Sequence, residues 1–301
     1  MKPRILVFAF LFGAVVCAAQ NPKLSDWKSL LVEKKDPGAA KSLCVSFTES
    51  KVLTEQVEAE KCLANVALFG ADALHLQNDE NGNPVMYDEY IPEAVDESLK
   101  HLNRGLQLAP QDLTIHQGRL HVLEIARRYP EMTLALDESC TIYHGEEVPS
   151  VWLAYPSELN DQHQYAAALE LMKVLDKHYP NSPDIVGNIG AFLSLLKKDA
   201  EAITYLKRAT DLAPNDPIIA WDLGREYDYA GQDALADIWY RKALSLMTDP
   251  QEMKNSNCAY AVFVETKLHD PSRACDMERK DCPSEKQAAC AAPAGSTELK
   301  R

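Results

Sequence analysis

Residues 183–250 read PDIVGNIGAFLSLLKKDAEAITYLKRATDLAPND and then PIIAWDLGREYDYAGQDALADIWYRKALSLMTDP, and this stretch decides the fold. Its two halves, 183–216 and 217–250, are equal in length and place similar residues at the same positions. Gly190 in the first half recurs as Gly224 in the second, and Ala202 recurs as Ala236. Self-similarity at a fixed period of this length is the sequence signature of a repeat architecture.

Each half contains two runs of apolar residues at the spacing of one helix face. The first run includes Ile189 and Leu193, and the second includes Leu206 and Ala209. Small residues on both runs allow two helices to pack closely. The pattern therefore predicts a pair of antiparallel helices per repeat, with the proline-containing segment at Pro214 forming the turn to the next pair.

The same phase extends one repeat backward, to residues 149–182. Pro180 occupies the position that Pro214 has in the following repeat, and Ala168 occupies the position of Ala202. The glycine position of this repeat is occupied by Pro156, so its first helix is expected to be short or bent.

Taken together, these positions resemble the tetratricopeptide repeat family, whose pattern has an aromatic residue, Leu-Gly, Tyr, and then Ala, a large residue and Ala. Residues 217–250 carry this set as Trp221, Leu223, Gly224, Tyr227, Ala236, Tyr240 and Ala243. The resemblance implies an all-α fold, a right-handed α-solenoid of antiparallel helix pairs. We expect about six repeats plus a capping helix.

The repeat phase divides the whole chain. The expected segments are a signal peptide at 1–19, a degenerate N-terminal repeat at 20–56, two repeats at 57–148 with an insertion at 77–91, three phased repeats at 149–250, a capping helix at 251–268, and a cysteine-containing tail at 269–301 that is either poorly ordered or pinned by disulfides. Solenoids need such a terminal cap because each repeat buries its apolar surface on its neighbours.

The first residues have the pattern of a secretory signal. Lys2 and Arg4 precede an apolar run that ends near Val16, and small residues follow up to Ala19. An alternative is a lipid anchor at Cys17, which Val16 disfavours because the residue before a lipidated cysteine is normally small. We expect an exported protein of the periplasm or the extracellular space, with no membrane segment after cleavage.

Charge and cysteine content fit this expectation. The formal net charge is −14, and removal of the two basic residues of the signal makes it about −16, which disfavours binding to nucleic acid. Seven of the eight cysteines remain after cleavage. In an oxidising compartment the simplest arrangement is three disulfides and one thiol, and the connectivity of Cys140, Cys258, Cys275, Cys282 and Cys290 stays open.

The sequence lacks the common catalytic and cofactor motifs, such as G-x-S-x-G, G-x-x-x-x-G-K and H-E-x-x-H. His116 and His121 are five residues apart, which does not place them on one helix face. Asp79, Asn81 and Gly82 have a weak likeness to a calcium loop, and the alternative is a solvated acidic loop. We therefore expect no enzyme activity, no cofactor and no metal.

In tetratricopeptide arrays the first helix of each pair lines a groove that binds peptides or protein segments. The family's phase assigns to this groove Trp221, Arg225, Tyr229, Asn160, Ser157 and Arg119, with Ala191 and Ser194 between them. Aromatic residues beside an arginine are typical of interface hot spots. The alternative is that Trp221 and Tyr229 serve packing within the solenoid.

The repeat phase also predicts a disulfide between Cys44 and Cys62. Cys44 falls on the second helix of the first repeat, and Cys62 falls on the first helix of the next. Both lie nine residues from Leu53, the centre of the expected turn. Residues equally distant from the turn between antiparallel helices lie at the same height. The alternative is two buried thiols.

These observations favour a non-enzymatic protein-binding or peptide-binding scaffold of the bacterial periplasm or cell envelope. Two alternatives remain open. One is an enzyme with an unrecognised site in the groove, and the other is a purely structural spacer of the envelope.

Overall fold

The computed structural model describes residues 22–70, 76–78, 84–86, 92–143 and 147–282. These residues form two compact units, an N-terminal unit (1–158) and a C-terminal unit (159–301), with the boundary inside helix α7. The signal peptide, Cys17, Cys290 and the calcium-loop residues Asp79, Asn81 and Gly82 lie outside the described residues.

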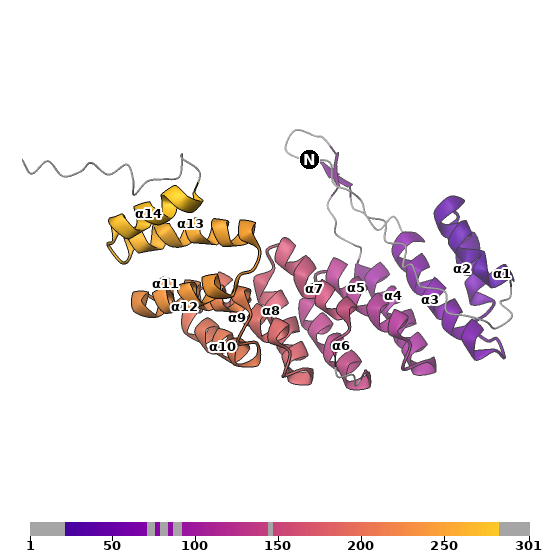
Figure 1. The fold of residues 1–301 in the computed structure, drawn as a ribbon. Coiled ribbons are helices and arrows are strands. Elements are labelled where there is room, and N and C mark those ends of the chain that lie inside the picture. Colours follow the sequence, from indigo (N-terminus) through magenta and orange to yellow (C-terminus); the bar gives the residue numbers. More distant parts are fainter. Residues whose placement is uncertain (1–21, 71–75, 79–83, 87–91, 144–146, 283–301) are drawn as a thin grey trace, which may run out of the picture. The chain divides into compact units, whose positions relative to one another are not determined.

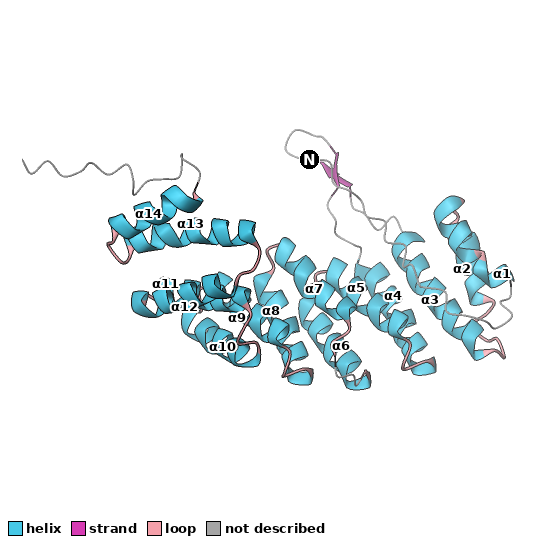
Figure 2. Cartoon of the chain, viewed as in Figure 1, coloured by secondary structure: helices cyan, strands magenta, loops and turns pink. Residues whose placement is uncertain are grey.

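The N-terminal unit is a succession of helices with one short hairpin (Figures 1 and 2). Its elements are α1 (Pro22–Ser25), the π-helix η1 (Ser29–Glu33), α2 (Pro37–Val45), α3 (Leu53–Gly70), β1 (Leu76–Asn78), β2 (Pro84–Met86), α4 (Pro92–Leu108), α5 (Leu113–Ile125), α6 (Tyr129–Ile142) and α7 (Ser150–Asp161). Adjacent helices pack against each other, as α2 does with α3 and α5 with α6. The first repeat is degenerate, because α1 and η1 stand where other repeats have one continuous helix.

The C-terminal unit repeats a helix hairpin. Its helices are α8 (Tyr165–His178), α9 (Pro183–Leu195), α10 (Asp199–Leu212), α11 (Pro217–Tyr229), α12 (Asp233–Leu246), α13 (Pro250–Thr266) and α14 (Pro271–Asp281). The pairs α9–α10, α11–α12 and α13–α14 pack closely. The expected fold class, a solenoid of antiparallel helix pairs, is confirmed.

The turns inside the helix pairs share one backbone design. Arg127, His163, Lys197 and Gly231 all have φ between 55° and 68°. In each turn the next residue donates its N–H to the carbonyl five residues earlier, as Lys198 does to Leu193 at 2.9 Å. This is a Schellman motif, which ends a helix by turning one residue into the left-handed region. Because this turn recurs, the helix pairs share the same hairpin geometry.

The C-terminal end differs from the expectation of a single capping helix and a tail. The helix expected at 251–268 is α13, and it pairs with α14, which lies in the segment assigned to the tail. Asp270 caps α14 by accepting a hydrogen bond from the backbone N of Arg273 at 3.0 Å. The structure joins Cys258 on α13 to Cys282 at the end of α14, with Cα atoms 5.2 Å apart. The tail thus begins as the second helix of a further pair.

The insertion also differs from the expected bounds of 77–91. Helix α3 ends at Gly70 and α4 begins at Pro92. Between them, β1 and β2 pair antiparallel with Leu76 opposite Met86. Helix α7 continues through Pro156 and has 12 residues, one fewer than α9 and α11. Proline is therefore accommodated within the first helix of that repeat, which is only slightly shortened.

Buried apolar side chains between neighbouring helices form the core. At the N-terminal end, Leu24, Trp27, Leu31, Ala40, Cys44 and Leu63 form one cluster. The indole N–H of Trp27 donates to Oε1 of Glu58 at 3.1 Å. At the other end, Tyr240 packs among Leu223, Tyr260 and Phe263. Among the described residues, no helix is both long enough and apolar enough to span a membrane.

Candidate partner-binding face

The first helix of the best-matched repeat, α11, presents the residues assigned to the groove. Asp216 caps the helix by accepting hydrogen bonds from the backbone N–H groups of Ile218 and Ile219 at 2.8 and 3.1 Å. Trp221, Arg225 and Tyr229 then follow at intervals of four residues, which places them on one face of α11.

This face carries large apolar side chains in contact with solvent. Ile218 is 60% exposed and Tyr229 is 56% exposed. On the preceding first helix, α9, Leu195 is 47% exposed. Lys197, in the turn after α9, has its Nζ 5.5 Å from the centre of the Tyr229 ring. We call the surface formed by these residues with Trp221 and Arg225 the α9–α11 face.

Trp221 serves packing within the repeat as well as this face. Its ring lies 4.7 Å from the ring of Tyr240 on α12, centre to centre. It also packs against the buried cluster of Ala220, Ala243 and Met247. The side chain is half-buried, so one part of the indole supports the hairpin and the other part faces solvent.

Arg225 is held by its own helix. Its guanidinium lies 2.8 Å from Oδ1 of Asp222, one turn earlier. Burial raises the pKa of the Asp222 carboxyl, and the nearby Arg225 only partly offsets this effect. Asp228 is paired with Lys267 of α13 at 3.3 Å. The charged groups of this face are therefore mostly matched in pairs.

Small residues occupy the α9 positions that correspond to Trp221 and Arg225, whereas Leu195 corresponds to Tyr229. Ala191 is half-buried and Ser194 is buried. Gly187, one turn before Ala191, has only ordinary van der Waals neighbours around the position of an added Cβ, the nearest being Ile219 at 3.7 Å. An alanine at position 187 would therefore fit without displacing its neighbours.

Ser157 and Asn160 both lie on α7 and belong to different units. Ser157 is exposed in the N-terminal unit. Asn160 is half-buried in the C-terminal unit, and its carbonyl accepts a hydrogen bond from the backbone N of His163 at 2.9 Å. This bond helps to close the turn after α7.

Arg119 does not occupy the equivalent of the α11 groove position. Counted from the capping residues, Arg119 is seven residues after Asp112, whereas Arg225 is nine after Asp216. The residues seven after the caps of α9 and α11 are Ile189 and Leu223, and both are core residues with 0% exposure. Arg119 instead pairs with Glu138 on α6.

The physical reason is the extra length of that repeat, which shifts its phase by two residues. The position nine after Asp112 is His121, which sequence reasoning did not assign. Its Nδ1 lies 3.5 Å from Oε2 of Glu124. The cap at Asp112 was the signal that could have identified it.

Arg119 lines a cavity of about 730 Å³ in the N-terminal unit. The cavity walls come from α4, α5 and α6 and include Asn103, Gln107, His116, Glu138 and Thr141. His116 is buried, and its Nε2 lies 2.8 Å from the carbonyl oxygen of Pro110. Its Nδ1 lies 2.9 Å from the Ser139 hydroxyl. Burial lowers the pKa of His116, which favours the neutral ring.

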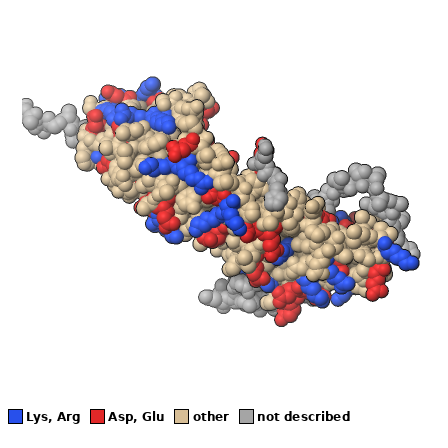
Figure 3. All heavy atoms as spheres, turned by 90° about the horizontal axis from the view of Figure 1, so that it is seen from below, with Lys and Arg blue, Asp and Glu red and all other residues tan. Residues whose placement is uncertain are grey.

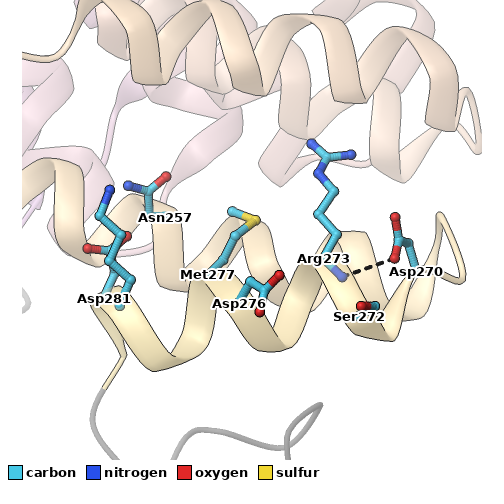
Figure 4. Close-up of a pocket in the computed structure, with 8 residues that line it drawn as sticks. Asn257, Asp270, Ser272, Arg273, Asp276, Met277 and Asp281 are labelled. Atoms are coloured by element: carbon cyan, nitrogen blue, oxygen red, sulfur yellow. Dashed lines mark hydrogen bonds between the residues drawn. The ribbon is translucent and has the colours of Figure 1, made fainter.

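A second cavity of about 490 Å³ lies along α13 and α14 (Figure 4). Its lining mixes polar and apolar groups and includes Asn257, Asp276 and Met277. Arg273 also lines it. The Nη2 of Arg273 lies 2.5 Å from the Tyr260 hydroxyl on α13 and 3.4 Å from Oδ1 of Asp237 on α12. These contacts tie α14 to the preceding helices and assign Arg273 a structural role.

The charged surface carries both signs. On the face drawn in Figure 3, acidic and basic side chains are interspersed, and no large area of one sign stands out. No group of three or more His, Cys, Asp or Glu side chains is placed to hold a metal ion in the part of the chain that the structure describes.

Helix hairpins of similar length, capped at the same positions and closed by the same turn, define a helical-repeat protein. Residues 159–223 match the family model of the tetratricopeptide repeat. Residues 159–223 therefore belong to a run of tetratricopeptide-type repeats. Such folds are generally protein-binding scaffolds and usually lack enzyme activity.

Several solved structures are similar to this chain. YrrB, a TPR protein with an unusual peptide-binding site, is 17% identical, with a TM-score of 0.37 over 54% of this chain and 82% of its own. PilF of Pseudomonas aeruginosa is 15% identical, with a TM-score of 0.39 over 64% of this chain and 87% of its own. Human IFIT1, solved as a dimer with PPP-AAAA, is 19% identical, with a TM-score of 0.43 over 88% of this chain and 59% of its own. No curated protein matches the chain.

Proposed function

We propose that the protein is a non-enzymatic scaffold of the bacterial periplasm or cell envelope that binds a protein or peptide on the α9–α11 face. The observation that carries this proposal is the exposure of Ile218, Tyr229 and Leu195 on the first helices of adjacent repeats. Exposed apolar side chains on one face favour an interaction site, and aromatic residues beside an arginine are enriched among those that dominate binding energy.

Two features support a location outside the cytoplasm. Residues 1–19 have the charge and apolar pattern of an export signal. The pairs Cys44–Cys62 and Cys258–Cys282 lie at disulfide distance, and such bonds persist in oxidising compartments. The net charge of −14 favours a protein partner over nucleic acid.

A photo-crosslinking amino acid at position 229 tests the binding face directly. The matched control is position 238, because Ile238 is 52% exposed on α12, the second helix of the same repeat. We expect crosslinks to a discrete partner from position 229 and none from position 238. The partner is then purified and titrated against wild type and Tyr229→Ala.

Equal crosslinking from both positions would contradict the assignment of the face. A chain that crosslinks to nothing in envelope extracts would favour the structural spacer. Location is tested separately by fractionation and N-terminal sequencing, for which we expect a mature chain that begins at Gln20.

A further inference from the structure

Glu226 is a buried carboxylate at the edge of the α9–α11 face. Its side chain is on α11, one residue after Arg225, and it is 0% exposed. Among the described residues neither of its carboxylate oxygens accepts a hydrogen bond of good geometry, and the Ser194 hydroxyl is the polar group that stabilises its charged form most. A buried polar group normally has partners, because its desolvation is otherwise uncompensated.

The equivalent positions in other repeats are apolar. Glu226 is ten residues after the cap Asp216, and the residues ten after the caps of α9 and α5 are Phe192 and Val122. Both of those side chains are buried. The repeat therefore does not need a carboxylate at this position, and an apolar side chain is its ordinary occupant.

The surroundings of Glu226 contain more acids than cations. Burial raises the pKa of Glu226, and the Ser194 hydroxyl and Arg225 only partly offset this effect, while Asp199 and Asp222 add to it. Arg225 is the cation among these groups, and its guanidinium is already 2.8 Å from Asp222. Asp222 precedes Glu226 by four residues, so the two carboxylates lie on the same side of α11.

Small side chains of the neighbouring helix lie beside Glu226 at the binding face. Ser194 adjoins Glu226, and Ala191 lies one turn earlier on α9. These small side chains cover the border between α9 and α11 with few atoms. Because Glu226 is 0% exposed, a ligand group reaches its carboxylate only when a neighbouring side chain moves.

We propose that Glu226 is a specificity residue that receives a lysine or arginine side chain of the bound partner. This inference rests on the proposed function, because it assigns the chemistry of the partner on the same face. The partner's cation pairs with Glu226 and Asp222, while its apolar neighbours contact Tyr229 and Ile218. A charge pair that forms only on binding supplies a cation to Glu226, whereas in the free protein the nearby Arg225 is paired with Asp222.

The first test measures stability without any ligand. If Glu226 serves recognition and costs stability, replacing it with the kind of apolar residue found in the other repeats should stabilise the fold. In the mature full-length chain, Glu226→Leu is expected to raise the thermal midpoint by about 2–4 °C at a pH of about 7.5. Glu226→Gln is expected not to lower it. If both variants lower the midpoint, Glu226 belongs to an internal network and the inference is wrong.

The second test measures specificity with synthetic peptides. The probe is an array of twelve-residue peptides that share apolar and aromatic positions and differ at one position, which is Lys, Arg, norleucine or Glu. We expect wild type to prefer Lys or Arg over norleucine by about tenfold, a typical effect of a charged pair. Glu226→Gln should remove this preference, whereas Tyr229→Ala should weaken all peptides alike.

The outcomes separate the two proposals. Binding of apolar peptides with no preference for Lys or Arg overturns the role of Glu226 and leaves the binding face intact. A preference that survives Glu226→Gln also overturns it. Failure of every peptide to bind to wild type overturns both proposals.

Discussion

Gly224 on α11 lies so close to Tyr240 on α12 that it has no room for a side chain. A Cβ atom on Gly224 would be 2.9 Å from Cδ1 of Tyr240 and 3.1 Å from its backbone nitrogen. The preceding repeat has the same contact, because a Cβ on Gly190 would be 2.6 Å from Cγ of Leu206. The glycine of each repeat is thus the point where the two helices of a pair approach each other.

Gly224→Ala is therefore expected to destabilise the protein by about 1–3 kcal/mol, the usual effect of overpacking against atoms that cannot move away. Gly187→Ala is the matched control on α9. An added Cβ there has its nearest neighbour at 3.7 Å, so the better helix propensity of alanine should stabilise by up to about 1 kcal/mol. Urea unfolding of both variants measures the difference. Equal effects of the two substitutions would show that the close contact does not limit the packing.

The fold was predictable from the sequence because such contacts leave a regular residue pattern. Gly190 and Gly224 fix the phase of the repeats, and the structure places both at the expected helix contacts. Arg119 was misplaced because its repeat is longer, and only the cap at Asp112 reveals the shift in phase. The helix α14 was missed because it is polar, and Ala274 and Glu278 are its only buried residues.

The candidate site was less predictable than the fold. Trp221 was assigned either to the groove or to packing, and its contact with Tyr240 shows that it packs. Glu226 has no sequence signal of its own, because one acid in an amphipathic helix resembles an exposed residue. Its burial, with no hydrogen bond of good geometry to either oxygen, becomes visible only when the neighbouring helix is in place.

The two aromatic residues of α11 should separate folding from binding. Trp221→Ala removes a half-buried ring that packs on Tyr240, so we expect a loss of about 2–3 kcal/mol in the free energy of unfolding. Tyr229 is 56% exposed, and Tyr229→Ala should change stability by less than about 0.5 kcal/mol. If Tyr229 is a hot spot, Tyr229→Ala should nevertheless weaken the binding free energy for the partner by about 2 kcal/mol. Chemical denaturation and partner titration give the two quantities, and a large stability loss for Tyr229→Ala would argue against a binding role.

The disulfide between Cys44 and Cys62 is expected to stabilise the first helix pair. The structure joins these residues across α2 and α3 with Cα atoms 6.1 Å apart, and both side chains are fully buried. Closing a loop of this length contributes about 3 kcal/mol in the chain-entropy model. Cys44→Ala should lower the unfolding free energy by a similar amount. In this variant, reducing agent should not destabilise the α2–α3 helix pair further.

Peptide mass spectrometry without reduction checks the pairing itself. Peptides that contain Cys44 and Cys62 should be linked to each other, and those that contain Cys258 should be linked to Cys282. A Cys44 peptide found unlinked, or linked to a cysteine beyond residue 250, would contradict the assignment.

His116 is expected to make the N-terminal unit sensitive to mild acid. Burial is the largest cause of its lowered pKa, so below the ordinary value of 6.5 the unfolded chain takes up a proton more readily than the folded chain. Stability therefore declines as the pH falls through 6.5, by at most about 1.4 kcal/mol per pH unit. Asp112, whose pKa is also lowered, contributes only in more acid solution, below its ordinary value of 3.8. His116→Gln keeps a side-chain N–H for the Pro110 carbonyl and does not titrate. Urea midpoints measured at about pH 7.5 and about pH 5 should thus differ less for this variant than for wild type, and an unchanged difference would show that another group is responsible.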